Sequence, residues 1–106
     1  MPRTITSIVF FYAYVLLSLK DRKHYIGYTA DLKKRVEEHK KGLVFSTKAR
    51  KPISLIYFEG CRNEEDARQR EKYLKTTRGR RWLGKRLSNF NKKLTQYDLK
   101  NRTELM

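Results

Sequence analysis

Five side chains in this sequence have the types and the spacing needed to cleave a phosphodiester together. Tyr14 and Tyr25 lie in two successive apolar runs, and Arg35 and His39 follow one helical turn apart in an amphipathic segment. Glu71 is the only carboxylate between residues 68 and 93. Hydrolysis requires an activated water, a proton acceptor and positive charge at the phosphate, and a divalent metal such as Mg²⁺ supplies several of these. The set therefore predicts metal-assisted cleavage of nucleic acid.

Arg35 and Glu71 each have an ordinary structural alternative. The planar fork of Arg35 can bind two phosphate oxygens, but Asp31, four residues earlier, is a ready surface partner. Glu71 with waters and substrate oxygens would make an adequate Mg²⁺ site, whereas Arg68 and Lys75 are spaced to form helix ion pairs with it. Spacing alone leaves both alternatives open.

The histidine and the tyrosines are equally ambiguous on spacing alone. His39 could move a proton or hold a phosphate oxygen, or it could be a half-buried packing residue. Tyr14 and Tyr25 also fit ordinary strand aromatics. A free phenol titrates near ~10, so a tyrosine acting as a base needs cations or a metal-bound water to lower its pKa. We expect the basic surroundings to act in that direction.

The charge of the chain points to polyanionic partners. A net charge of +15 in 106 residues favours nucleic acid first and an anionic membrane surface second. Between residues 68 and 93, eleven basic side chains accompany a single acid, which predicts phosphate binding there, with simple solubility as the alternative. The side chains predicted to contact nucleic acid are Lys48, Arg50, Arg78, Arg80 and Arg81.

Length and composition limit the remaining classes. A chain of this length forms one domain. Its single cysteine, Cys61, excludes an internal disulfide and predicts a cytoplasmic location. The longest apolar run, residues 8–17, is shorter than the ~20 residues of a membrane span, and we expect no signal peptide. Neither zinc-ligand spacing nor a glycine-rich phosphate loop is present in the sequence.

Hydrophobic periodicity predicts an α+β fold with the order ββαβαα, a small three-stranded antiparallel sheet flanked by helices. The first strand is almost wholly apolar, which is typical of the centre of a sheet. Gly27, in the second strand, marks either a bulge or a close approach of another backbone or a ligand. The predicted strands are residues 8–17, 24–29 and 53–59. The predicted helices are residues 31–41, capped by Thr29 or Asp31 and closed by Gly42, residues 63–75, capped by Asn63, and a third through 82–90.

The order of these motifs resembles the GIY-YIG nuclease family over residues 10–87. The first family motif appears as Ala13-Tyr14-Val15, with alanine in place of glycine, and the second is intact as Tyr25-Ile26-Gly27. The segment from Asp31 to His39 matches the family's helix with an arginine and then a histidine. The segment from Arg70 to Leu74 matches its later helix with a metal-binding glutamate.

The resemblance implies a single-metal cut of DNA or, less favoured, RNA, with Mg²⁺ or Mn²⁺ as cofactor. In that picture Tyr14 deprotonates or orients the attacking water, and Arg35 stabilises charge on the phosphorus oxygens. Tyr25 and His39 position the water and the phosphate, while Glu71 holds the metal. Non-catalytic nucleic-acid binding on the same fold, and a basic scaffold docking on ribosomal RNA or protein, are the competing functions.

The resemblance also implies the limits of the domain. We assign residues 1–9 to an N-terminal extension, 10–90 to the nuclease-like domain and 91–106 to a basic tail whose last dozen residues are expected to fray. An asparagine near the last helix often completes the family's site; Asn89 and Asn91 are both candidates, and Asn89 is the additional site residue that we name. The chain resembles short standalone members, so we expect a monomer or weak dimer, no long recognition site, and a role for a protein partner in targeting.

Overall fold

The computed structural model describes residues 8–105, with side chains placed as far as residue 96. The chain forms two compact units, residues 1–73 and 74–106. Within the described residues no helix is both long and apolar enough to cross a membrane. The elements, in chain order, are β1 (Phe11–Ser18), β2 (His24–Thr29), α1 (Leu32–Lys40), the short 3₁₀ helix η2 (Lys48–Arg50), β3 (Ile53–Cys61), α2 (Glu64–Lys75), α3 (Thr77–Arg86) and α4 (Ser88–Leu105).

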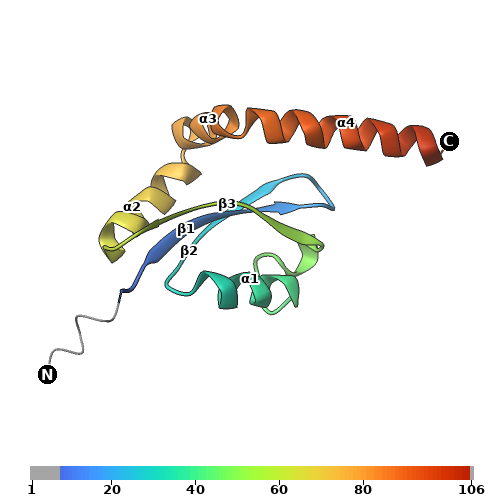
Figure 1. Cartoon of the computed structure of the whole chain (residues 1–106). Coiled ribbons are helices and arrows are strands. Elements are labelled where there is room, and N and C mark those ends of the chain that lie inside the picture. The colour runs from blue at the N-terminus through green and yellow to red at the C-terminus, as the bar shows by residue number, and fades with distance from the viewer. Residues whose placement is uncertain (1–7, 106) are drawn as a thin grey trace, which may run out of the picture. The chain divides into compact units, whose positions relative to one another are not determined.

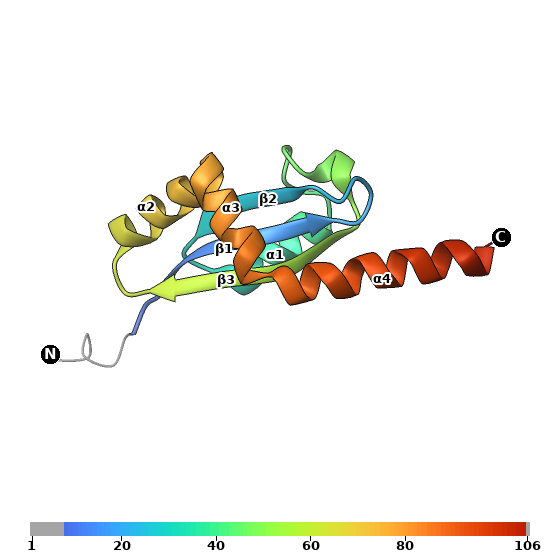
Figure 2. The same ribbon diagram turned by 90° about the horizontal axis from the view of Figure 1, so that it is seen from above.

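The three strands form one antiparallel sheet in the order β2-β1-β3, so the most apolar strand is central, as predicted (Figure 2). Strand β1 begins at Phe11, three residues later than expected. The reason is pairing, because the last partners offered by the neighbouring strands are Thr29 for Tyr12 and Cys61 for Phe11. Val9, placed in the strand by hydrophobicity, is 51% exposed.

Helix α1 covers one face of the sheet (Figure 1). Its first turn is capped by Asp31, whose side chain accepts a hydrogen bond from the backbone N–H of Lys34 at 3.1 Å. Because side chains alternate along a strand, one set of β1 residues faces this helix. The core on this face is formed by Tyr14, Leu16, Val36 and Ile53.

Helix α2 is fastened to the sheet by a two-pronged ion pair. Arg70 donates through Nε and Nη2 to the two carboxylate oxygens of Glu59 on β3, at 2.8 and 3.0 Å. The predicted cap is present, since the side chain of Asn63 accepts from the backbone N–H of Asp66 at 3.0 Å. The bidentate geometry fixes the rotation of α2 about its axis. It therefore also fixes the direction in which Glu71, on the same helix, points.

The second unit differs from the expected single helix over 82–90. Thr76 caps α3 by accepting from the backbone N–H of Gly79 at 3.0 Å. The helix stops at Leu87, whose backbone departs from helical values, and α4 then contacts α3 and runs on through Leu105. The chain is thus helical where the weakening pattern predicted fraying, and the element order gains one helix. The sequence of α4 has only weak helical periodicity, so this helix was not predicted.

A glycine is required at position 27 because the Tyr14 side chain fills the space that a Cβ would occupy. It stands opposite Tyr14 in a regular stretch of the β1–β2 pairing, so the bulge alternative is wrong. A Cβ added to Gly27 would overlap the Tyr14 hydroxyl and lie 2.5 Å from its Cζ and 3.0 Å from its Cε1. The close approach at this glycine is therefore made by a side chain, the Tyr14 phenol, and not by the backbone or ligand that we expected.

We expect Gly27→Ala to destabilise the protein by ~1–3 kcal/mol, the usual cost of forcing extra atoms into a packed core. The matched control is Gly84→Ala in α3, where an added Cβ meets nothing within 4 Å and helix propensity favours alanine by ~0.5–1 kcal/mol. Urea unfolding of both variants measures the difference. Equal stability of the two variants would show that the Tyr14 ring is free to move aside.

Candidate active site

Three rings meet beneath the centre of the sheet. Tyr14, which is 1% exposed, lies with its Oη 2.9 Å from Nε2 of His39 on α1. The Tyr25 ring lies beside both, with centroid separations of 6.5 Å to Tyr14 and 5.2 Å to His39. The hairpin and the following helix thus bring together the two phenols and the imidazole, as their order in the chain led us to expect.

His39 is a fully buried polar link. Its Nδ1 lies 2.7 Å from Oγ1 of Thr47, a residue that is itself completely buried. Burial, reinforced by the nearby charge of Arg35 and partly offset by Glu38, lowers the pKa of His39 to about 4. The imidazole is therefore neutral at pH 7, with one nitrogen donating and the other accepting. Of the alternatives left open by the sequence, a packing residue describes His39 better than a group that moves a proton or holds a phosphate oxygen, and the side chain is fully rather than half buried.

Thr47 is the member of this cluster that sequence reasoning missed. It lies in an irregular segment between α1 and η2, eight positions after His39. Threonine in a polar loop carries no signal of its own, because nothing local shows that its hydroxyl will be buried. Only its contact with His39 distinguishes it.

The pKa of Tyr14 is raised, which contradicts the expectation that the basic surroundings would lower it. Burial is the largest cause, because the phenolate would lose its hydration. The adjacent guanidinium of Arg35 opposes this effect but does not overcome it. Tyr14 therefore presents a neutral hydroxyl at pH 7, able to donate a hydrogen bond or to accept one.

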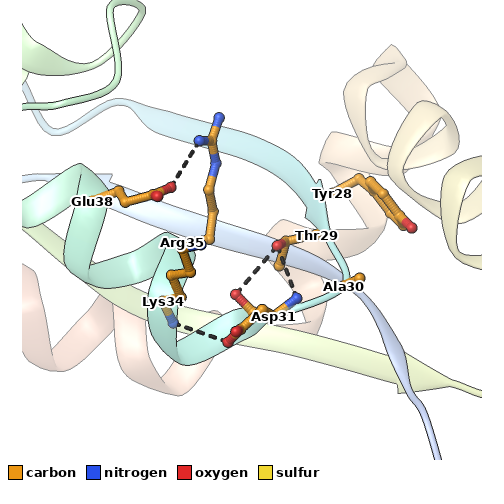
Figure 3. Close-up of a pocket in the computed structure, with 7 residues that line it drawn as sticks. All are labelled: Tyr28, Thr29, Ala30, Asp31, Lys34, Arg35 and Glu38. Atoms are coloured by element: carbon orange, nitrogen blue, oxygen red, sulfur yellow. Dashed lines mark hydrogen bonds and ion pairs between the residues drawn. The ribbon is translucent and has the colours of Figure 1, made fainter.

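Arg35 lies at the rim of an open pocket of about 360 Å³ (Figure 3). Its Nη1 donates to Oε1 of Glu38 at 3.0 Å. The surface pair with Asp31 considered above is therefore not formed, since Asp31 caps the helix instead. The Arg35 side chain is about a third exposed, so a phosphate can reach it. The pocket is lined by Tyr28, Thr29, Ala30, Asp31, Lys34, Arg35 and Glu38.

Glu71 is half-buried on α2 and close enough to Tyr14 for its negative charge to contribute to the raised pKa of the phenol. Arg68, one of the two ion-pair partners considered for Glu71, instead donates to Glu64 at 3.1 Å. Among the described residues, three or more histidine, cysteine or acidic side chains nowhere gather to hold a metal ion. The donor set fits a hard cation that takes one carboxylate and completes its shell with water and substrate oxygens.

The basic residues expected to bind nucleic acid are divided between the two units. Lys48 and Arg50 lie on η2 in the first unit. Arg78, Arg80 and Arg81 are exposed on α3 in the second unit, as is Asn89 on α4. The first unit therefore contains all five residues predicted to do chemistry, while the asparagine belongs to the second unit.

The lowered pKa of His39 makes stability depend on pH with a definite sign. Because the unfolded chain binds the proton more readily than the folded protein, stability is lost as the pH falls from about 6.5 towards 4. We expect a loss of about 2 kcal/mol between pH 7 and pH 5. Urea unfolding at the two pH values measures it, with His39→Gln as the control that lacks this slope. Equal slopes in both proteins would contradict a neutral, buried His39.

Comparison with known proteins identifies the family of the chain. A family model described as the GIY-YIG catalytic domain matches residues 10–86. The chain is 40% identical over 65 residues to a UPF0213 protein of Clostridium perfringens, covering 60% of this chain and 69% of that protein. It is 43% identical over 68 residues to UPF0213 protein YazA of Bacillus subtilis, covering 62% and 65%.

A relative with a solved structure is also similar in sequence. The chain is 30% identical to a UPF0213 protein from Bacillus halodurans studied by solution NMR, with coverage of 70% of this chain and 81% of that one and a TM-score of 0.44. The chain spans about two thirds of the length of the curated relatives. The family match covers most of the sequence and includes both tyrosine motifs, the arginine–histidine helix and Glu71. The chain therefore belongs to the GIY-YIG family.

Proposed function

We propose that this protein is a metal-dependent endonuclease that hydrolyses phosphodiester bonds in nucleic acid with a single divalent cation, and DNA is the substrate that we favour over RNA. The observation that carries the proposal is the set of partners around one buried phenol. Tyr14 is hydrogen-bonded to His39 and lies within the electrostatic reach of both Arg35 and Glu71. A cation and an anion beside one phenol, in a chain of charge +15, suit the stabilisation of a phosphate better than simple packing does.

Arg35 is the group that would bind the phosphate undergoing attack. Its exposed fork can donate to two non-bridging oxygens, whose charge grows as the water attacks. In the free protein the fork donates to Glu38. Phosphate binding therefore replaces an existing ion pair, and Glu38 holds the guanidinium near the pocket until substrate arrives.

Tyr14 is the group that would orient the attacking water. The pair formed by His39 and Thr47 fixes the phenol in place, because a neutral imidazole must match one donor and one acceptor. Tyr25 packs against the same two rings and limits their rotation. These contacts prepare the hydroxyl before substrate binds, so little free energy is spent on reorganisation.

Glu71 would hold the metal, Mg²⁺ or Mn²⁺. When bound, such a cation supplies positive charge to the phosphate and lowers the pKa of a coordinated water. The carboxylate stands on α2, whose rotation is fixed by the pair between Arg70 and Glu59. A divalent cation held by this carboxylate would also offset its repulsion of the substrate phosphates.

We expect Glu71→Gln to abolish cleavage while leaving binding of nucleic acid intact or tighter, because a negative charge near the phosphate is removed. The measurement is single-turnover cleavage of labelled duplex, single-stranded, flapped, branched and RNA substrates with Mg²⁺, Mn²⁺ or EDTA. Glu65→Gln, which removes an exposed carboxylate from the same helix, is the control. Undiminished cutting by Glu71→Gln would refute the single-metal site. Tight binding without cutting by the parent would favour a non-catalytic module.

We expect Arg35→Ala to slow the chemical step by ~10²–10³-fold, the usual loss when one donor to a developing oxyanion is removed. Lys33→Ala, two residues away on the exposed side of α1, removes the same charge without touching the pocket and should change the rate little. Single-turnover rates at saturating protein separate chemistry from affinity. If only the affinity falls, Arg35 positions the substrate and does not stabilise the transition state.

A further inference from the structure

The most exposed large apolar side chains in the described structure stand on one loop. The loop between α1 and β3, residues 41–52, carries Phe45 at 84% exposure and Leu43 at 71%. By contrast Val44, between them, is buried, at 8%. Within this loop, the side chain of Val44 is therefore buried in the core, and those of Leu43 and Phe45 are exposed to solvent.

Hydrogen bonds fix the backbone that exposes these side chains. The N–H groups of Thr47 and Lys48 both donate to the carbonyl of Val44, at 3.1 and 2.9 Å. Ser18 on β1 donates to the carbonyl of Arg50 at 2.7 Å, which ties the far side of the loop to the sheet. Phe45 is thus held away from the core by hydrogen bonds on both sides of it, and its exposure is a property of the fold.

The charge around Phe45 is entirely positive along the chain. From residue 39 to residue 58 the sequence contains no acidic side chain. The ammonium of Lys48 lies 5.4 Å from the centroid of the Phe45 ring. An exposed ring beside clustered cations matches a ligand that is both aromatic and anionic. The cations of this stretch are Lys40, Lys41, Lys48, Arg50 and Lys51.

We propose that Phe45, together with Leu43 two residues earlier, stacks on unpaired bases of the substrate, so that the preferred nucleic acid contains a single-stranded segment. This inference rests on the proposed function and narrows its substrate class. A duplex hides its base faces within the helix, whereas single strands and branch points offer them to aromatic side chains. Neighbouring lysines and arginines would follow the backbone of the same strand.

A second protein is a weaker fit as the occupant. Stable protein interfaces bury roughly 800 Å² on each partner, far more than two projecting side chains provide. A partner would also have to neutralise every cation of this loop. A nucleotide strand meets both features at once, because each nucleotide carries one flat ring system and one negative charge.

The loop is connected to the candidate active site by two hydrogen bonds. Thr47, two residues after Phe45, is bonded to His39, and His39 is bonded to Tyr14. The backbone that presents Phe45 is therefore anchored to the phenol proposed to orient water. Bases stacked on Phe45 would hold the adjoining strand in a fixed register relative to that phenol.

The test measures binding in EDTA, so that cleavage does not interfere. Fluorescence anisotropy gives the affinity for three labelled DNA probes: a single strand, a blunt duplex and a duplex with single-stranded arms. Phe45→Ala should weaken binding of the single strand and the armed duplex by about tenfold or more. Its affinity for the blunt duplex should change less than twofold. Phe45→Trp should bind the first two probes at least as well as the parent. A 2-aminopurine base in the unpaired arm should change fluorescence with the parent and not with Phe45→Ala.

Two control variants complete the experiment. Phe58→Ala removes another exposed ring, one that lies on β3, and should leave all three affinities unchanged. Lys48→Ala should weaken all three probes, because a charge is lost whatever the strand structure. Equal weakening of duplex and single strand by Phe45→Ala, or no weakening, would overturn the proposal, as would a change confined to oligomeric state. Because the assay requires no cutting, it can fail while the nuclease proposal stands, and the reverse also holds.

Discussion

The hydroxyl of Tyr14 is a polar group at the centre of an apolar sheet, and the first unit is organised around satisfying it. Burying a hydroxyl without a partner costs several kcal/mol, and His39 removes that cost from the facing helix. The imidazole is buried too, so its second nitrogen also needs a partner, which Thr47 supplies. Among described residues, buried side-chain polar atoms without a partner are absent. Gly27 leaves the space that this arrangement requires.

This chain of hydrogen bonds joins pieces that are distant in sequence. Strand β1, helix α1 and the loop before β3 each contribute one member, so the loop cannot shift without disturbing the phenol. The same desolvation that makes the bonds strong also keeps Tyr14 and His39 neutral. A rigid, uncharged cluster lies beneath a charged rim, where Arg35 remains accessible. The buried cluster of Tyr14 and His39 thus provides a fixed position, whereas Arg35 is the residue that can exchange its partner for the substrate.

The ion pairs made by Arg70 and by Arg35 have unequal roles. The pair between Arg70 and Glu59 has two short bonds and limited exposure, so it acts as a fixed brace for α2. The pair between Arg35 and Glu38 has one bond at a similar partial exposure, and single-bond pairs near the surface contribute little to stability. That weakness suits a group that must change partners. Three acidic side chains of this basic protein, Glu38, Glu59 and Glu64, are paired with arginines.

Periodicity and capping are local signals, so sequence alone determined the strands and helices as far as α2, apart from the short η2, together with the central place of β1 and the Asn63 cap of α2. It left the cap of α1 open between Thr29 and Asp31, and it missed that the second unit contains two helices. The five candidate site residues were named through the family resemblance, because their spacing alone left structural alternatives open. Tertiary structure decided the rest. The partner of Arg35, the role of Thr47 and the direction of the Tyr14 pKa shift depend on long-range contacts and on the water that they exclude. The spacing of residues along the chain contains no information on long-range contacts or on excluded water. The residues could therefore be named from the sequence, but their environment could not be predicted from it.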